Sequence, residues 1–200
     1  MPETPLPALT DRTVHLCIDM QRIFTAEGPW PTPWMGRVLP VVTELARRFP
    51  ERTVFTRFIT PERPEERPGN WRRYYEKWRR ATRAELAPGL LDLVAPLAAL
   101  VPPAVTVDKT RYSAFLGSGL HEHLLARGAD GLIVTGSETD VCVLATVLSA
   151  VDLGWRVILV RDAVCSSSDA GHDALLEVYH GRYSLQIETA DAEDVLRQWP

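Results

Sequence analysis

Three side chains of complementary chemistry each stand at the end of a predicted strand. Asp19 follows the apolar stretch from Thr13 to Ile18, Lys109 lies just beyond the short strand predicted at Ala104 to Val107, and Cys142 follows the stretch that begins at Leu132. The carboxyl ends of parallel strands border the crevice where such sheets bind ligands. A carboxylate, an ammonium group and a thiol in one crevice would supply a base, a cation that favours thiolate, and a nucleophile. The three positions therefore predict cysteine-dependent acyl transfer.

The amino-acid composition makes Lys109 stand out. Of the 22 Lys and Arg side chains in the chain, only Lys77 and Lys109 are lysines. An ammonium group is a compact charge on a slim stem, whereas a guanidinium is a planar fork. A crowded catalytic site would favour the former.

The turn before Cys142 has the pattern of a strand that passes through Gly136 into a helix. Apolar residues recur at helical spacing from Cys142 until Gly154. Backbone N–H groups at a helix start lower the pKa of a thiol and can hold an oxyanion, so we expect a reactive Cys142. The alternative, a buried and inert thiol, remains open from the pattern alone.

Strands and helices alternate along the rest of the chain. Further strands are predicted at 53–59, 156–160 and 185–188, and helices at 38–49, 120–127, 173–179 and 192–199, with Pro40 tolerable only near a first turn. This order predicts an α/β fold in which helices flank both faces of a mainly parallel sheet.

Composition excludes several classes of function. The 200 residues, 46% hydrophobic and 24% charged, fit one domain, and a net charge of −4 offers no cationic field for nucleic acid. No apolar run approaches the ~20 residues that span a membrane, and residues 1–12 read as a loose arm rather than a signal peptide, so we expect a cytoplasmic protein. Three cysteines without a CxxC pair, Cys17, Cys142 and Cys165, predict free thiols, with no zinc site and no cofactor.

The stretch from residue 61 to 104 is the least regular part of the chain and predicts an excursion from the sheet. Within it Trp71, Tyr74, Tyr75 and Trp78 are spaced as one stripe of a helix that continues to Leu86. We call these four residues the aromatic stripe. It fits a lid or a subunit contact in a homodimer or higher homo-oligomer, and equally an ordinary packing surface.

Three segments, LCIDMQRIF, VDKTRYSAF and VTGSETDVCV, resemble in order and spacing the signatures of the isochorismatase-like cysteine hydrolases. The resemblance runs from about Thr13 to Val164 and implies a three-layer Rossmann-like sandwich with a mainly parallel six-stranded sheet flanked by helices. It implies that Asp19 carries the proton, Lys109 is its electrostatic partner and Cys142 is the nucleophile. It also implies a cis peptide bond between Ser137 and Glu138, with the N–H groups of Glu138 and Cys142 forming an oxyanion hole.

Two departures narrow the expected activity. Metal-binding nicotinamidases carry metal ligands where this chain has Phe58 and Thr60, so no metal is expected. True isochorismatases, which hydrolyse a vinyl ether, lack the nucleophilic cysteine. The resemblance therefore favours hydrolysis of a C–N bond in a small amide or ureide, with vinyl-ether hydrolysis and a non-catalytic binding module as alternatives.

The expected substrate-binding residues lie near the strand ends: Gln21, Phe24, Trp30 and Tyr112. The five histidines, His15, His121, His123, His172 and His180, offer no evident partner for Cys142 and are expected to be structural. GSGLHEH lacks the third glycine of a dinucleotide fingerprint and the second histidine of a zinc protease.

Overall fold

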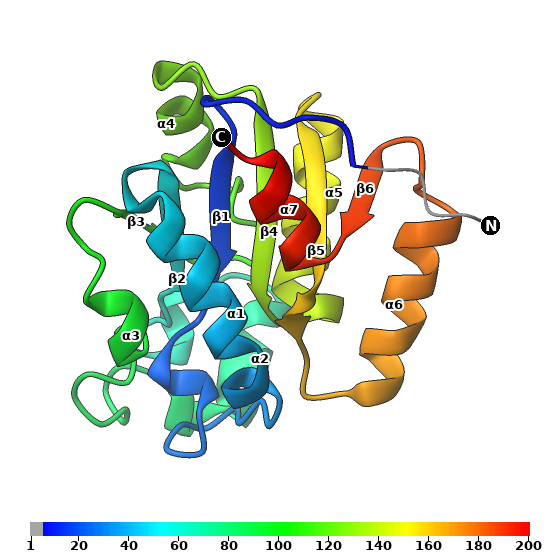
Figure 1. The fold of residues 1–200 in the computed structure, drawn as a ribbon. Helices are drawn as coiled ribbons and strands as arrows, with labels where there is room; N and C mark the ends of the chain where they lie inside the picture. Colours follow the sequence, from blue (N-terminus) through cyan, green and yellow to red (C-terminus); the bar gives the residue numbers. More distant parts are fainter. Residues whose placement is uncertain (1–5) are drawn as a thin grey trace.

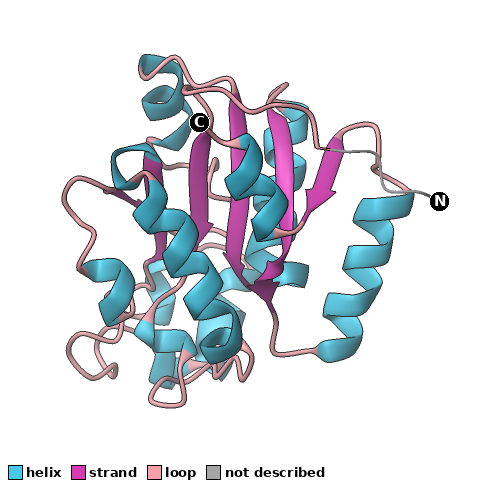
Figure 2. Cartoon of the chain, viewed as in Figure 1, coloured by secondary structure: helices cyan, strands magenta, loops and turns pink. Residues whose placement is uncertain are grey.

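The computed structural model describes residues 6–200. Its centre is one six-stranded sheet in which all strands run parallel (Figures 1 and 2). The strand order is β3-β2-β1-β4-β5-β6. The strands are β1 Val14–Ile18, β2 Thr53–Phe58, β3 Val105–Lys109, β4 Gly131–Ser137, β5 Arg156–Cys165 and β6 Ile187–Ala190. Because the order reverses between β1 and β4, the carboxyl ends of these two neighbours border the crevice that such sheets use for ligands.

Seven α-helices occur in the described chain: α1 Met35–Arg48, α2 Asn70–Lys77, α3 Ala95–Ala98, α4 Leu120–Ala126, α5 Leu144–Asp152, α6 Asp169–Gly181 and α7 Ala192–Gln198. The apolar side chains form two cores, one on each face of the sheet. Helices α1 and α7 contribute to one core, and α4, α5 and α6 to the other. Helices α2 and α3 lie near the edge toward which the strand arrows point (Figure 1). The expected three-layer α/β sandwich is confirmed.

The sequence of β4 shows why both faces are covered. Leu132 and Val134 enter the core of α4 and α5, whereas Ile133 between them enters the core of α1. Successive strand side chains point to opposite faces, so a strand buried on both sides is an unbroken apolar run. All seven residues of β4 are buried.

Several element boundaries differ from those predicted. Helix α1 begins at Met35, so Pro40 lies inside it rather than in its first turn. Strand β6 begins at Ile187, and Leu185, expected in that strand, is 96% exposed. Strand β5 extends beyond Val160 to Cys165, and the long helix expected from Trp71 to Leu86 ends at Lys77. Helix α6 begins at Asp169, before the predicted Asp173.

Gly136 is required where β4 meets β1. Its φ is +110°, and a Cβ there would lie 2.1 Å from the carbonyl oxygen of Ile18. Only glycine adopts this conformation readily, and only glycine leaves room for the neighbouring backbone. The register of β4 against β5 also shifts between Val134 and Gly136. The close approach brings the end of β4 next to the residue that precedes Asp19.

The N-terminal stretch was expected to be loose over residues 1–12, of which 1–5 lie outside the described residues. In the described part Leu9 is 5% exposed and its N–H donates to the carbonyl of Gln198, so this part is packed on the domain. All three cysteines are free thiols, as expected. No helix of the described chain has both the length and the apolarity needed to cross a membrane.

Candidate active site

A buried ion pair occupies the carboxyl end of the sheet. Lys109 Nζ lies 2.6 Å from Asp19 Oδ2, and both side chains are 0% exposed. Asp19 has φ +49°, a left-handed conformation that aspartate adopts more readily than most residues. The hydroxyl of Thr56, on β2, donates to Asp19 Oδ1 at 2.6 Å and accepts from the Asp19 N–H at 3.1 Å. Thr56 of β2 and Lys109 of β3 therefore hold the carboxylate that follows β1.

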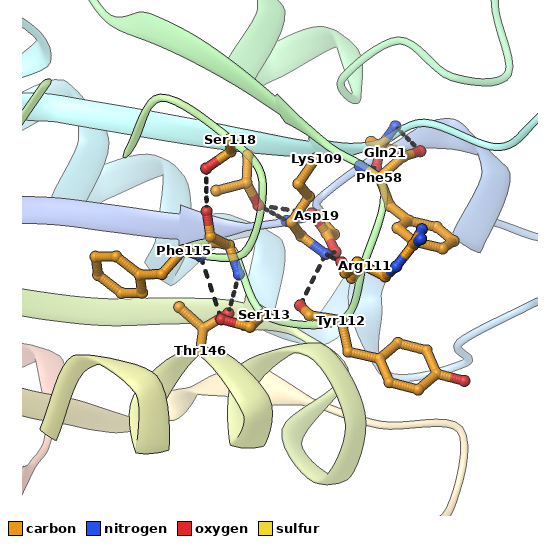
Figure 3. A network of polar contacts seen from close by, with 12 residues as sticks. Asp19, Gln21, Phe58, Lys109, Arg111, Tyr112, Ser113, Phe115, Ser118 and Thr146 are labelled. Atoms are coloured by element: carbon orange, nitrogen blue, oxygen red, sulfur yellow. Dashed lines mark hydrogen bonds and ion pairs between the residues drawn. The ribbon is translucent and has the colours of Figure 1, made fainter. Parts of the chain in front are cut away.

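Lys109 has further partners in the segment that follows β3 (Figure 3). Its ammonium group donates to the carbonyls of Arg111 and Tyr112, each at 3.0 Å, and lies 4.9 Å from the centre of the Phe58 ring. Burial alone would lower the pKa of Lys109, but the charges of Asp19 and of a Cys142 thiolate outweigh it and raise that pKa. Lys109 is therefore a fixed cation.

Cys142 lies in a one-turn π-helix, Thr139–Val143, between β4 and α5. The expected cis peptide bond between Ser137 and Glu138 is confirmed. The carbonyl of Glu138 accepts from the N–H groups of Val141 and Val143, each at 3.0 Å, which folds the turn back on its start. The helix expected from Cys142 thus begins as a π-helix and becomes α-helical only at Leu144.

The electrostatic setting of Cys142 differs from the one expected. Burial is the largest influence and raises the pKa of the thiol, Lys109 lowers it, and Asp19 raises it again, with a net pKa well above the ordinary value. Lys109 thus acts in the expected direction, but the prediction of a thiol pKa below the ordinary value is wrong, because burial outweighs the effect of the cation. Cys142 is 6% exposed, and its thiol is held protonated within the influence of both a carboxylate and an ammonium group.

A cavity of about 440 Å³ opens onto Cys142. Most of its wall is aromatic or proline, and Arg80 and Glu138 are its charged residues. The lining residues are Phe24, Pro29, Trp30, Pro31, Phe58, Tyr74, Trp78, Arg80, Tyr112, Glu138, Val141, Cys142 and Ser167. This volume is at the lower end of the range for small-molecule sites.

Three of the four residues expected to bind substrate, Phe24, Trp30 and Tyr112, line the cavity. Gln21 does not. Its side chain is 0% exposed, accepts from the N–H of Phe58 at 2.7 Å and donates to the carbonyl of Leu91 at 2.7 Å. Because both ends of the amide are bound to backbone, Gln21 links the end of β2 to Leu91 of the excursion rather than meeting a ligand.

The aromatic stripe packs within the chain. Tyr75 is 0% exposed, Trp71 contacts Tyr112 at a ring distance of 4.8 Å, and Tyr74 and Trp78 both lie 6.0 Å from Trp30. Of the roles that the sequence left open for the stripe, packing within the chain is observed, and two of its members, Tyr74 and Trp78, form cavity wall. The subunit contact stays a prediction.

Phe58 and Thr60, which stand where the resemblance to nicotinamidases implies metal ligands, do not lie in the same environment. Phe58 lines the cavity, and Thr60 is 0% exposed outside its lining. Within residues 6–200, no three His, Cys, Asp or Glu side chains come together in a way that could hold a metal ion.

Some site residues carried no signal in the sequence. Thr56 is an ordinary strand threonine until its hydroxyl is seen on Asp19, and Arg80 lies in a run of arginines. Ser167 donates its N–H to Glu138 Oε1 at 3.0 Å, which ties the side chain of Glu138 to the segment after β5. Alternation of strands and helices predicts which strand ends meet, but not which loop residues close over them.

Comparison with known proteins places the chain in a family. The family model for the Isochorismatase domain matches residues 13–191, and the chain belongs to this family. An uncharacterized isochorismatase family protein of Bacillus subtilis, YwoC, is 26% identical over 90% of this chain and 92% of its own length.

Other relatives have more specific names. Maleamate amidohydrolase of Pseudomonas putida is 33% identical over 56% of each chain, and a probable inactive nicotinamidase of Arabidopsis thaliana is 28% identical over 81% of this chain and 85% of its own. The chain spans about half the length of some relatives, including 47% of the Bacillus subtilis protein PncA, to which it is 35% identical over 43% of its own length. The family thus includes amidohydrolases.

Among solved structures, a cysteine hydrolase of Pseudomonas syringae superposes with a TM-score of 0.80 at 22% identity, covering 99% of this chain and 97% of the other. At this identity the match supports the fold.

Proposed function

We propose that this protein is a cysteine-dependent hydrolase that cleaves a C–N bond of a small amide or ureide through a thioester. One observation carries the proposal: a fully buried Asp19–Lys109 ion pair acts on the thiol of Cys142, which lines a cavity of small-molecule size. A buried ion pair costs desolvation energy and is weak evidence of stability, so its position beside a thiol favours a catalytic role.

In the proposed mechanism Asp19 takes the thiol proton as Cys142 Sγ bonds to the substrate carbonyl carbon. The raised pKa of the thiol makes this transfer part of the attack, because little thiolate exists beforehand. The C–N bond then breaks as Asp19 gives its proton to the departing nitrogen. A water molecule next loses a proton to Asp19 and attacks the thioester, and the C–S bond breaks as the thiol regains its proton.

Lys109 keeps its charge throughout. Its contacts with the carbonyls of Arg111 and Tyr112 hold the ammonium group between the carboxylate and the developing thiolate. The N–H groups of Glu138 and Cys142 are assigned to the oxyanion of the tetrahedral intermediate, where preorganised donors stabilise charge most effectively. No cofactor takes part.

The cavity wall supports a small substrate with an apolar or flat body. Phe24 and Trp30 stack at a ring distance of 6.0 Å, and Trp78 meets Trp30 edge-on. Such aromatic surfaces bind planar groups by offset or edge contacts. The names of the maleamate and ureidoacrylate amidohydrolases among the relatives agree with hydrolysis of an amide or a ureide.

Substitution of Asp19, Lys109 and Cys142, which we call the triad, tests the proposal. Small amides and ureides are screened by ammonia release, and Cys142→Ala and Asp19→Asn should each lower kcat at least ~10³-fold, because no neighbour can replace either step. Lys109→Arg should also lose activity, since the planar guanidinium group of arginine does not fit the position of an ammonium group. Cys17→Ala, which removes another buried thiol, is the matched control and should keep near-normal kcat. Near-normal hydrolysis by Cys142→Ala would refute the mechanism.

The same assays separate the alternatives. Vinyl-ether hydrolysis would survive loss of the thiol. A non-catalytic module, which the inactive plant relative makes worth testing, would bind a ligand that blocks alkylation of Cys142 while no amide is turned over.

A further inference from the structure

Three consecutive residues before the nucleophile are bonded to one segment of the chain. This segment, Ser166 to His172, joins the end of β5 to the first turn of α6, and we call it the clamp segment. Its bonds are Ser167 N–H to Glu138 Oε1 at 3.0 Å, His172 Nδ1 to Thr139 Oγ1 at 2.8 Å, and Ser166 Oγ to Asp140 Oδ1 at 2.6 Å. Glu138, Thr139 and Asp140 are thus each held from the same side.

Asp140 makes the closest of these approaches. A Cβ added at Gly171 would lie 2.2 Å from Asp140 Oδ2 and 3.1 Å from Ser168 Oγ. The carboxylate therefore lies directly on the backbone of the first turn of α6, in space that only glycine leaves free. A carboxylate is also favoured at this end of a helix by the helix dipole.

Gly171 is otherwise an unfavourable choice. Glycine inside a helix is about 1 kcal/mol worse than alanine, and its N–H bond to Ser168 Oγ would form with any residue but proline. The contact with Asp140 supplies the reason for a glycine here.

We propose that Asp140 is a positioning residue that acts with Ser166 and Gly171. Together they fix the π-helical turn so that Cys142 and the N–H groups assigned to the oxyanion keep their places during acyl transfer. Small displacements of reacting groups cost catalysis heavily, about 10²-fold for an error of ~1 Å. This inference rests on the proposed hydrolase function, because its effect is on the chemical step.

The first test pairs two glycines of the same helix. Gly171→Ala should lower kcat at least tenfold while KM changes less than about twofold, because the new Cβ displaces the Asp140 carboxylate. Gly181→Ala, at the other end of α6 with nothing within 4 Å of its Cβ, should leave both constants unchanged. A normal kcat in Gly171→Ala would overturn the proposal.

A double-mutant cycle separates positioning from general loss of structure. Asp140→Ala and Gly171→Ala should each lower kcat, and the double variant should be no slower than the worse single variant, because both changes break the same contact. Losses of kcat that multiply in the double variant would contradict the proposed coupling between Asp140 and Gly171.

If Gly171→Ala fails to fold, Ser166→Ala gives the same comparison, with Ser184→Ala, at an exposed serine after α6, as its control. A normal kcat in both Asp140→Ala and Ser166→Ala would overturn the proposal.

Hydrogen exchange distinguishes failure of the positioning proposal for Asp140 from failure of the hydrolase proposal. Backbone N–H groups of residues 137–143 should exchange faster in Asp140→Ala than in Ser184→Ala, whether or not an amide substrate is found. If exchange is faster in Asp140→Ala but the unaltered protein turns over no amide, the positioning proposal is supported and the proposed hydrolase function is refuted. If neither the exchange nor kcat changes in Asp140→Ala, the positioning proposal alone is refuted.

Discussion

The thiol of Cys142 meets opposite influences from its two charged neighbours. Asp19 and burial raise its pKa, and Lys109 lowers it. The Asp19 carboxylate, which hinders ionisation of the thiol, is also the group that can accept its proton. In the proposed mechanism the proton therefore stays on sulfur before attack and moves to Asp19 during attack. A permanent thiolate is unnecessary in this arrangement.

The raised pKa predicts the pH dependence of thiol modification. In the unliganded protein the rate of Cys142 alkylation by iodoacetamide should still be rising at pH 9.5, because thiolate accumulates only above the ordinary pKa of a cysteine. Peptide mass spectrometry after timed labelling gives the rate at each pH. A plateau below pH 7 would mean that the helix start and Lys109 dominate instead.

Phe58 and Thr60 stand where the resemblance to metal-binding nicotinamidases implies metal ligands, so we predict that hydrolysis is independent of metal. Neither side chain offers the imidazole or carboxylate that zinc and iron prefer. Dialysis against a strong chelator should therefore leave kcat within about twofold of its starting value. Loss of activity on chelation, restored by zinc or iron, would contradict this interpretation of the end of β2.

At the scale of elements, α2 and the turn after it are the segment most open to substrate tuning. Tyr75 anchors α2 in the core, which leaves Tyr74 and Trp78 facing the cavity. Arg80 donates to the carbonyl of Pro29 at 3.0 Å and so links this segment to the loop that carries Trp30. Two segments distant in sequence thereby form one wall.

Trp78→Ala should raise KM several-fold to about tenfold, since aromatic contacts of this kind contribute roughly 0.5–1.5 kcal/mol beyond area burial. The alkylation rate of Cys142 should change little, because the triad is not touched. Arg79→Ala, an exposed neighbour outside the cavity lining, is the control and should have normal KM. Sedimentation velocity on Trp78→Ala also tests the predicted homo-oligomer, in which Trp78 was expected to contribute. Unaltered KM and assembly would leave Trp78 with a packing role alone.

How well the sequence predicts each element depends on whether local pattern decides it. Cys142 and Asp19 were predictable because each follows a buried apolar run, and parallel strands bring such ends together. The role of Gln21 was not predictable, because its partners Phe58 and Leu91 are distant in sequence. The pKa of Cys142 was predicted in the wrong direction because its burial comes from the surrounding fold rather than from its own turn. Helix ends such as that of α2 are set by packing that no local spacing encodes.

At the scale of the whole molecule, one buried histidine couples stability to pH. His15, in β1, is 0% exposed, lies 2.8 Å from Thr135 Oγ1 on β4, and burial lowers its pKa to about 3 from an ordinary value of 6.5. Below pH 6.5 the unfolded chain binds a proton that the folded one does not, so the stability present above that pH is lost as pH falls toward 3.

This coupling gives a measurable slope. Between pH 6 and pH 4 the free energy of unfolding should fall more steeply for the unaltered protein than for His15→Gln, by up to ~1.4 kcal/mol per pH unit. Urea titrations at several pH values provide the slopes. Equal slopes would show that His15 is protonated in the folded protein at these pH values.

The position of β1 between β2 and β4 also has a consequence for the order in which the chain becomes complete on the ribosome. Strand β1 is made first, but one of its two neighbours, β4, begins only at Gly131. Until then one edge of the future centre of the sheet is open, and open edges of apolar strands are prone to pair with other chains. Asp19 and Lys109 therefore precede β4 in synthesis, and the strand that gives β1 its second neighbour is the one that leads directly to Cys142.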